Sequence, residues 1–398
     1  MHLPALTLTT VLVSPAVDRL LAVALLVLGA LVLLSIGPLG VLRDPAFIAY
    51  DLATFHTAGE RLLAGLDPWR LAIEGQEPAF SYPPNAGALL VAYALLPEAA
   101  VFAVHSLISL LLLLSMGRLA QLWFLGDRLT LPIAFCLLPF LVNTHVAYLF
   151  YTGQITLIPV AAALWCCHMA ARGRWLAAGI LLGIAALKPQ IGGLLLVWFA
   201  AKLSLPVIVT SGIVFALMCL PAIVAVGPVA TVAGWLESLE WYRSFPSNQL
   251  GNDAVEGLPS LLAARGIEGV STPLALVALL VPVLLARTLS GASVALTVSL
   301  LLGTGFVLVY AHGYDLSGFA LFACFLLWCA FRDGRLLVVA GAGLLVLALA
   351  FPAALLGRIG IVLPDQWRTL CLILALGLAW VLERRARGRE ALERAGRA

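Results

Sequence analysis

The sequence has very little charge. Of its 398 residues, 63% are hydrophobic and only 11% are charged. A soluble domain carries roughly a quarter charged residues, so a water-soluble globular protein is excluded. The formal net charge of +3 is too small and too dispersed for a nucleic-acid partner. Apolar stretches near the length of a membrane span recur along the whole chain, which indicates a polytopic membrane protein.

The sequence also lacks the motifs that mark nucleotide, metal and disulfide chemistry. No G-x-x-x-x-G-K-[ST] phosphate loop is present, so ATP binding of that kind is excluded. The seven cysteines stand in apolar stretches without C-x-x-C spacing, which indicates packing rather than a metal site or a disulfide framework. No cluster of His, Asp and Glu has metal-ligand spacing, and we predict that neither a metal nor a cofactor is required.

Hydropathy and charge together predict an all-α polytopic integral membrane protein with about 11–12 transmembrane segments, in a single domain over residues 1–398. When the N-terminus is placed in the cytoplasm, most Lys and Arg between the spans lie inside, as the positive-inside rule requires. The C-terminal basic tail 383–398 is then also cytoplasmic, and the long loops 41–97 and 227–271 lie outside the inner membrane. The predicted spans are 18–40, 98–117, 130–150, 154–171, 175–187, 189–201, 203–226, 272–286, 292–310, 316–331, 336–357 and 367–382.

The segment 175–201 is predicted to be broken at Lys188-Pro189. A single span there would invert every later loop, whereas proline lacks an amide hydrogen and biases the preceding residue away from helix. Gly192-Gly193 would let the chain turn. Backbone broken at membrane depth is tolerated only where it lines a cavity or is buried in protein. Lys188 at this break suits a phosphate on which charge develops; a lysine that reaches to the membrane surface is the alternative.

The first long loop contains an acidic residue on an apolar face. Asp44-Pro45 predicts the start of a helix and Gly65 its end. Asp51 falls in the middle of the apolar face of this helix, whereas His56 and Glu60 point the opposite way. A carboxylate on a packing face is costly unless it is paired, hydrated or protonated. At the opening of a cavity in the bundle, Asp51 would be placed to take a proton from a hydroxyl.

Several short stretches, in this order, resemble the polyprenol-phosphate-sugar-dependent glycosyltransferases of family 87, within the C superfamily of membrane glycosyltransferases. The resemblance implies a C-superfamily-like fold with amphipathic helices in the first outer loop, Asp51 as catalytic base, a lipid-linked sugar phosphate as donor and a site at the outer face. Trp69 stands where the family pattern has tyrosine. The stretches are Asp51-Leu52-Ala53, Ala64-Gly65-Leu66-Asp67-Pro68-Trp69, Phe80-Ser81-Tyr82-Pro83-Pro84, Gly153-Gln154, Ala178 to Gly183, Lys188-Pro189, Asn248-Gln249 and His312.

Further candidate site residues lie on the predicted outer side. Arg61 would help Lys188 to hold the donor phosphate. His312 beside Asp315 suits proton relay or a hydrogen bond to substrate, and a structural histidine is the alternative. The remaining candidates would contact substrate, with helix capping, interfacial anchoring or a solvated connection as alternatives. They are Trp69 and Tyr82, predicted with Phe80 to be exposed, and His145, Gln154, Asn248 and Gln249.

The second long loop is predicted to begin with an amphipathic helix on the membrane surface, because Trp235, Trp241 and Tyr242 occur there together with Glu237 and Glu240. The polar stretch that follows has no apolar period. It would form either a substrate lid or a solvated connection.

These features predict a glycosyltransferase that moves a hexose, mannose being the best-known case in the family, from a polyprenyl-phosphate donor to a hydroxyl of a membrane glycolipid or glycan. The reaction would be a single displacement with inversion. The expected partners are the donor, a lipid or glycan acceptor and membrane lipids, without nucleotide or nucleic acid. The alternatives are a secondary transporter or lipid flippase with Asp51 and Lys188 as coupled charges, which the lack of an internal repeat disfavours, and a non-catalytic membrane partner.

Overall fold

The computed structural model describes residues 49–70, 80–124, 143–289, 291–350 and 366–395, together with Val27 and Gly360. Within this part of the chain the backbone is helical apart from short connections and one two-stranded sheet. Four features of the sequence prediction fall outside it: the span 18–40 apart from Val27, the helix start at Asp44-Pro45, the first part of the span 130–150 and the end of the span 336–357.

The first long loop folds into a small helical unit with its own apolar core. Here α5 packs so closely on α3 that a Cβ atom at Gly59 would lie 2.2 Å from the carbonyl oxygen of Leu90. The elements of this part are α3 (Tyr50–Leu63), η3 (Pro84–Ala86), α5 (Gly87–Ala94) and α6 (Glu98–Phe124).

His56 is buried, and its Nε2 lies 3.0 Å from the carbonyl of Leu96, just after α5. The predicted exposure of two aromatic residues in this unit is wrong. Trp69 and Phe80 are each only 1% exposed. The indole N–H of Trp69 donates to the carbonyl of Tyr82 at 2.9 Å, and both rings pack in the core of the unit rather than at its surface.

The predicted break at Lys188-Pro189 is confirmed, since α10 ends at Ala185 and α11 begins at Pro189. Gly192 does not form a turn. It lies within α11, where a Cβ atom would be 2.7 Å from the backbone of Ala185, so it allows α11 to pack against the end of α10. The elements of this region are α8 (Thr144–Thr152), α9 (Leu157–Ala171), α10 (Trp175–Ala185), α11 (Pro189–Ala201) and α12 (Leu205–Val226).

The second half of the chain adds a helical loop region and five further long helices. The two strands pair antiparallel, with Val255 opposite His312 and Glu256 opposite Ala311. The elements are α13 (Pro228–Ser244), η4 (Pro246–Asn248), β1 (Val255–Glu256), α14 (Leu258–Ala263), α15 (Ser271–Thr288), α16 (Val294–Leu308), β2 (Ala311–His312), η5 (Gly313–Phe319), α17 (Ala320–Asp333), α18 (Leu336–Ala350) and α20 (Trp367–Ala395).

Four helical segments of the described chain are long and apolar enough to cross a membrane: Ala100–Phe124, Leu205–Val226, Ser271–Thr288 and Gly313–Asp333. Five shorter apolar helices accompany them, and large apolar side chains are exposed along α12 and α15. An apolar surface of this kind belongs in lipid. The chain is therefore an all-α membrane protein, as its hydropathy predicts.

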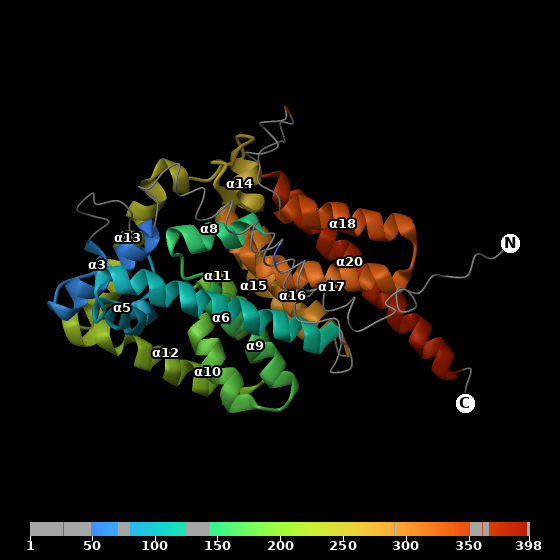
Figure 1. Cartoon of the computed structure of the whole chain (residues 1–398), viewed down its shortest axis with the longest axis horizontal. Coiled ribbons are helices and arrows are strands. Elements are labelled where there is room, and N and C mark those ends of the chain that lie inside the picture. Colours follow the sequence, from blue (N-terminus) through green and yellow to red (C-terminus); the bar gives the residue numbers. More distant parts are fainter. Residues whose placement is uncertain are drawn as a thin grey trace.

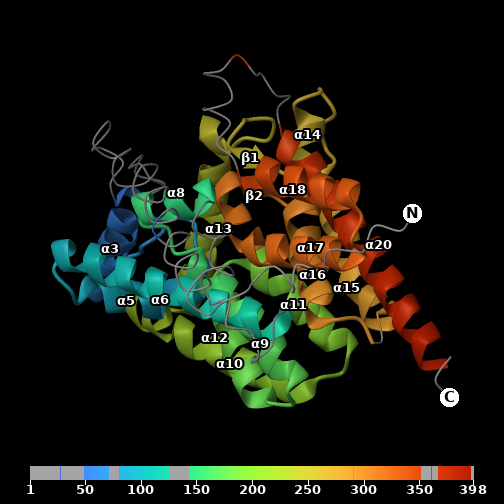
Figure 2. The same cartoon turned by 45° about the vertical axis from the view of Figure 1, so that its right-hand side comes forward.

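The helices form one elongated bundle. In Figure 1, α3 and α5 lie at one end, α6 runs along the bundle, and α18 and α20 lie at the other end. The view in Figure 2 shows the same order and shows that α20 extends well past its neighbours. The predicted cytoplasmic tail thus continues the last predicted span as one helix up to Ala395.

We expect Gly59→Ala to lower the thermal stability of the protein. The added methyl group would collide with the Leu90 backbone, and overpacking of this kind costs about 1–3 kcal/mol. Gly193→Ala is the matched control, because nothing lies within 4 Å of a Cβ atom at that helical glycine and alanine is the better helix former. Thermal unfolding in detergent compares the two variants. An equal shift in both would contradict the close contact between α3 and α5.

Candidate functional site

Asp51 lies in the first turn of α3, and its side chain is half-buried. The Ala49 N–H just before this helix donates to the carbonyl of Tyr151 at 2.9 Å, so the start of α3 is attached to the end of α8. Burial raises the pKa of Asp51, while hydrogen bonds from the side chains of Thr152 and Gln154 and the charge of Lys188 oppose that rise. A carboxylate in this setting is a better proton acceptor than one in water.

The turn after α8 brings Gln154 to Asp51. Gly153 has a φ of 73°, and a Cβ atom there would lie 2.5 Å from the Cβ of Leu52, so only glycine lets this turn approach α3 so closely. The Tyr82 hydroxyl donates to Gln154 Oε1 at 2.8 Å. The amide nitrogen of the same side chain is the group that remains to donate to Asp51.

Lys188 occupies the break between α10 and α11 and is 4% exposed. Its Nζ lies 2.6 Å from Oδ1 of Asp315, which is buried as well. The ring centroids of Tyr314 and Tyr82 lie 4.7 and 5.8 Å from the same nitrogen. The ammonium group is thus stabilised by one carboxylate and two aromatic faces, and the alternative of a lysine that extends to the membrane surface is wrong.

Asp315 joins Lys188 to His312. Its second oxygen, Oδ2, accepts a hydrogen bond from the backbone N–H of His312 at 3.1 Å. His312 Nδ1 lies 3.2 Å from the carbonyl of Ala254, and the His312 side chain also accepts the backbone N–H of Asp315. Nε2 lies 2.6 Å from the Tyr242 hydroxyl and 3.0 Å from the Tyr310 hydroxyl. Burial lowers the pKa of His312 to about 4, so the ring is neutral at physiological pH.

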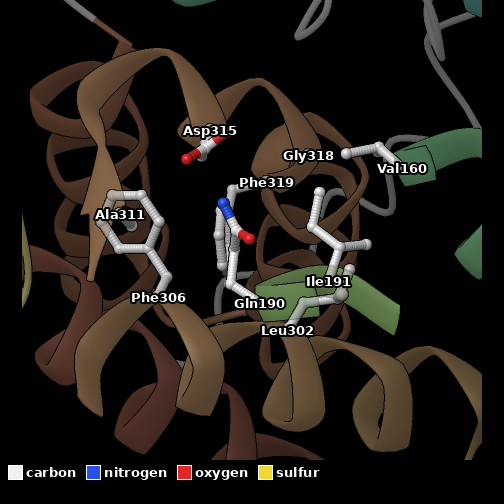
Figure 3. Close-up of a pocket in the computed structure, with 9 residues that line it drawn as sticks. All are labelled: Val160, Gln190, Ile191, Leu302, Phe306, Ala311, Asp315, Gly318 and Phe319. Atoms are coloured by element: carbon white, nitrogen blue, oxygen red, sulfur yellow. The ribbon is translucent and has the colours of Figure 1, made fainter. Parts of the chain in front are cut away.

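A small cavity lies beside Asp315. Asp315 and Gln190 reach toward it, and the other walls are mostly apolar side chains from α9, α11, α16 and η5 (Figure 3). Its volume of about 20 Å³ has room for one water molecule.

The cluster therefore unites Asp51, Tyr82, Gln154, Lys188, His312 and Asp315. The other predicted site residues make different contacts. Arg61 lies ten residues after Asp51 on α3, about 15 Å along the helix axis, and its Nε donates to the carbonyl of Asp67 at 2.9 Å. Arg61 is therefore not part of this cluster.

Three further candidates contact the backbone near helix ends. The backbone N–H of His145 donates to Asn143 Oδ1, the N-cap of α8, and its ring lies 3.1 Å from the carbonyl of Leu349. The side chains of Asn248 and Gln249 donate to carbonyls in the last turns of α13. Trp69 lies in the core of the first loop. The observed hydrogen bonds of Trp69 and of these three residues are not to side chains of the cluster around Asp51, so their contact with substrate stays a prediction.

The helix α13 is present as predicted, but it does not turn all its aromatic residues to a membrane surface. The Trp235 indole donates to the carbonyl of Ser81 at 3.2 Å, and Tyr242 bonds to His312, whereas Trp241 is 42% exposed. One side of α13 therefore packs over the site. The sequence of α13 alone does not predict this packing, because the partners of Trp235 and Tyr242 come from the first loop and from β2.

One residue of this site is absent from the sequence prediction. His105 is a fully buried histidine of α6, with Nδ1 2.7 Å from the Tyr93 hydroxyl. It also forms a hydrogen bond with the backbone of Gln154, and because the N–H of Gln154 already donates to Leu149, the carbonyl accepts it. An ionisable residue within an apolar span is the signal that marks such a position.

Comparison with known sequences identifies the family of the chain. Residues 80–330, more than half of the chain, match the sequence model of glycosyltransferase family 87. No curated protein and no solved structure matches the chain. The match includes Tyr82, Gln154, Lys188, His312 and Asp315 but begins after Asp51, whose place in the cluster rests on its contacts.

Proposed function

The chain belongs to glycosyltransferase family 87, and we propose that it moves a hexose, with mannose as the first candidate, from a polyprenyl-phosphate donor to a hydroxyl of a membrane glycolipid or glycan. The reaction takes place at the extracytoplasmic face of the cell's inner membrane, which the chain crosses several times with both termini in the cytoplasm. The observation that carries this proposal is the half-buried carboxylate of Asp51 in one connected cluster with the buried cation of Lys188.

The chemistry assigns one task to each of these groups. Asp51 takes the proton of the acceptor hydroxyl, and that oxygen attacks the anomeric carbon of the donor sugar. The bond from this carbon to the phosphate oxygen breaks, so that polyprenyl phosphate leaves and the configuration inverts. Lys188 stabilises the negative charge that develops on the leaving phosphate, because only one of its three N–H groups is needed by Asp315.

The neutral ring of His312 has a more limited role. Its Nε2 lies within hydrogen-bond distance of the hydroxyls of Tyr242 and Tyr310, so a substrate hydroxyl bonds to that nitrogen only by displacing one of them. Tyr82 and Gln154 lie between the base and the cation and are the side chains best placed to contact the transferred sugar. Family membership favours this enzyme over a transporter, a flippase or a non-catalytic partner.

The test is transfer by the purified protein in lipid vesicles that contain a membrane glycolipid acceptor. A radiolabelled polyprenyl-phosphate hexose is compared with the same hexose on a nucleotide. We expect label in the acceptor from the lipid donor alone, with the opposite anomeric configuration in the product. Equal transfer from the nucleotide sugar, or retention of configuration, would contradict the proposal.

His105 is expected to influence the pH dependence of this reaction through Gln154. In His105→Phe the Gln154 carbonyl loses its partner, so the Gln154 side chain is held less firmly toward Asp51. Because that side chain lowers the pKa of Asp51, its loss raises the pKa further. Activity requires the deprotonated base, so the acid limb of the kcat profile should move to higher pH, with kcat reduced about tenfold and the donor KM unchanged.

The control for this experiment is His168→Phe. His168 is also a buried histidine bonded to a neighbouring ring, with Trp123 Nε1 2.9 Å from its Nδ1, but it lies in the last turn of α9. If both variants lose stability to the same extent and neither changes the pH profile, His105 is only a structural residue.

A further inference from the structure

The tyrosines around Asp51 differ in exposure. Within the described part of the chain, Tyr82, Tyr148, Tyr242 and Tyr314 lie close enough to interact with its charge. The hydroxyl of Tyr82 is held by Gln154 and that of Tyr242 by His312, and these two rings and that of Tyr314 are half-buried. Tyr148 is 43% exposed and marks the accessible side.

The position of Tyr148 on α8 sets its distance from the base. Tyr148 and Thr152 are four residues apart and share one face of the helix, and Thr152 hydrogen-bonds to Asp51. The Tyr148 ring therefore lies one helical turn, about 6 Å along the axis, from the point at which α8 contacts the carboxylate. This separation is close to the width of one sugar ring.

The ring of Tyr148 is fixed by its neighbours. It lies parallel to Tyr314, with an angle of 3° and a centroid distance of 5.8 Å, and Tyr151 meets it at 67°. Tyr314 also stacks on His312 and faces Lys188, so it separates Tyr148 from the cation. The cluster thus has a buried side that carries the positive charge and an open aromatic side next to the base.

An exposed aromatic ring with few rotatable bonds offers its face to the C–H groups of a pyranose at little cost in conformational entropy. We propose that Tyr148 forms an acceptor subsite, on which a sugar ring of the acceptor stacks so that its hydroxyl reaches Asp51. The acceptor is accordingly a glycoside and not a simple lipid alcohol. This inference rests on the proposed function, and it goes further in naming the residue that binds the sugar ring of the acceptor.

The test compares Tyr148→Ala and Tyr148→Phe in the transfer reaction. Stacking depends on the ring and not on the hydroxyl, so we expect Tyr148→Ala to raise the acceptor KM about tenfold or more with the donor KM unchanged, and Tyr148→Phe to behave as wild type. Trp241→Ala is the matched control, since Trp241 is exposed to the same degree and is expected from its place on α13 to be an interfacial anchor. A long-chain alcohol should not replace the glycolipid acceptor.

A binding measurement separates failure of the subsite from failure of the proposed function. Ligand-observed NMR with a methyl hexoside as probe should show binding to wild type and Tyr148→Phe and at least tenfold weaker binding to Tyr148→Ala, whether or not transfer is observed. The subsite is refuted if the alanine variant binds the probe and uses the acceptor as well as wild type does. It is also refuted if Trp241→Ala produces the same loss, because the effect is then one of membrane anchoring.

Discussion

Replacement of Asp51 by asparagine should lower the rate of sugar transfer by a factor of about 10²–10⁴ without a large change in stability. Asparagine has the same shape, and its oxygen still accepts the hydrogen bonds that Thr152 and Gln154 offer. It cannot take a proton at neutral pH, so the acceptor hydroxyl remains a weak nucleophile. Initial rates of label transfer and the thermal unfolding midpoint in the same detergent measure the two quantities.

The control for this replacement is Asp67→Asn. Asp67 belongs to the same loop, and its Oδ1 accepts the backbone N–H of Trp69 at 2.9 Å, a bond that asparagine keeps. We expect nearly full activity from this variant. If Asp51→Asn and Asp67→Asn both transfer sugar at the wild-type rate, Asp51 is not the catalytic base. If both lose activity equally, the loss comes from a disturbed fold of the loop and not from the missing base.

The second large effect is expected at the buried ion pair between Lys188 and Asp315. Loss of either partner leaves an uncompensated charge in a low-dielectric interior, which costs about 3–5 kcal/mol. Lys188→Met and Asp315→Leu should each unfold at markedly lower temperature. In the double variant no buried charge remains at this position, so most of the stability should return, apart from the bond between Asp315 and the His312 N–H.

Activity should not follow stability in this series. The double variant lacks the cation that stabilises the leaving phosphate, so it should remain inactive although it folds. A double-mutant cycle on the unfolding midpoints measures the coupling of the pair. Two results would overturn this account: additive single effects, which would mean that the pair is not coupled, and transfer by the refolded double variant, which would mean that the phosphate does not need Lys188.

The parts of the site that the sequence predicts are those with a local signature. Asp51 stands out because a carboxylate on the apolar face of a helix breaks the periodicity of its own segment. The break at Lys188-Pro189 follows from the chemistry of proline and from the need to keep the later basic loops on one side. Both signals lie within a few residues of the position that they mark.

The parts that the sequence does not predict depend on distant contacts. Lys188 and Asp315 are 127 residues apart, and nothing in either segment identifies the other. Trp69 has the flanking turn of an exposed residue, but α3, α5 and Phe80 cover it. The same is true of Tyr242, whose partner His312 is aligned by a strand pair of only two residues on each side, too short for any alternation to be recognised.

The long separation of the buried pair has a consequence for biosynthesis. A ribosome that adds 5–20 residues per second needs about 6–25 s to make the 127 residues between Lys188 and Asp315. During that interval the ammonium group has already entered the nascent bundle, while its counter-ion has not been translated. The chain must therefore keep this junction hydrated, or hold it at the translocon, until Asp315 has been added.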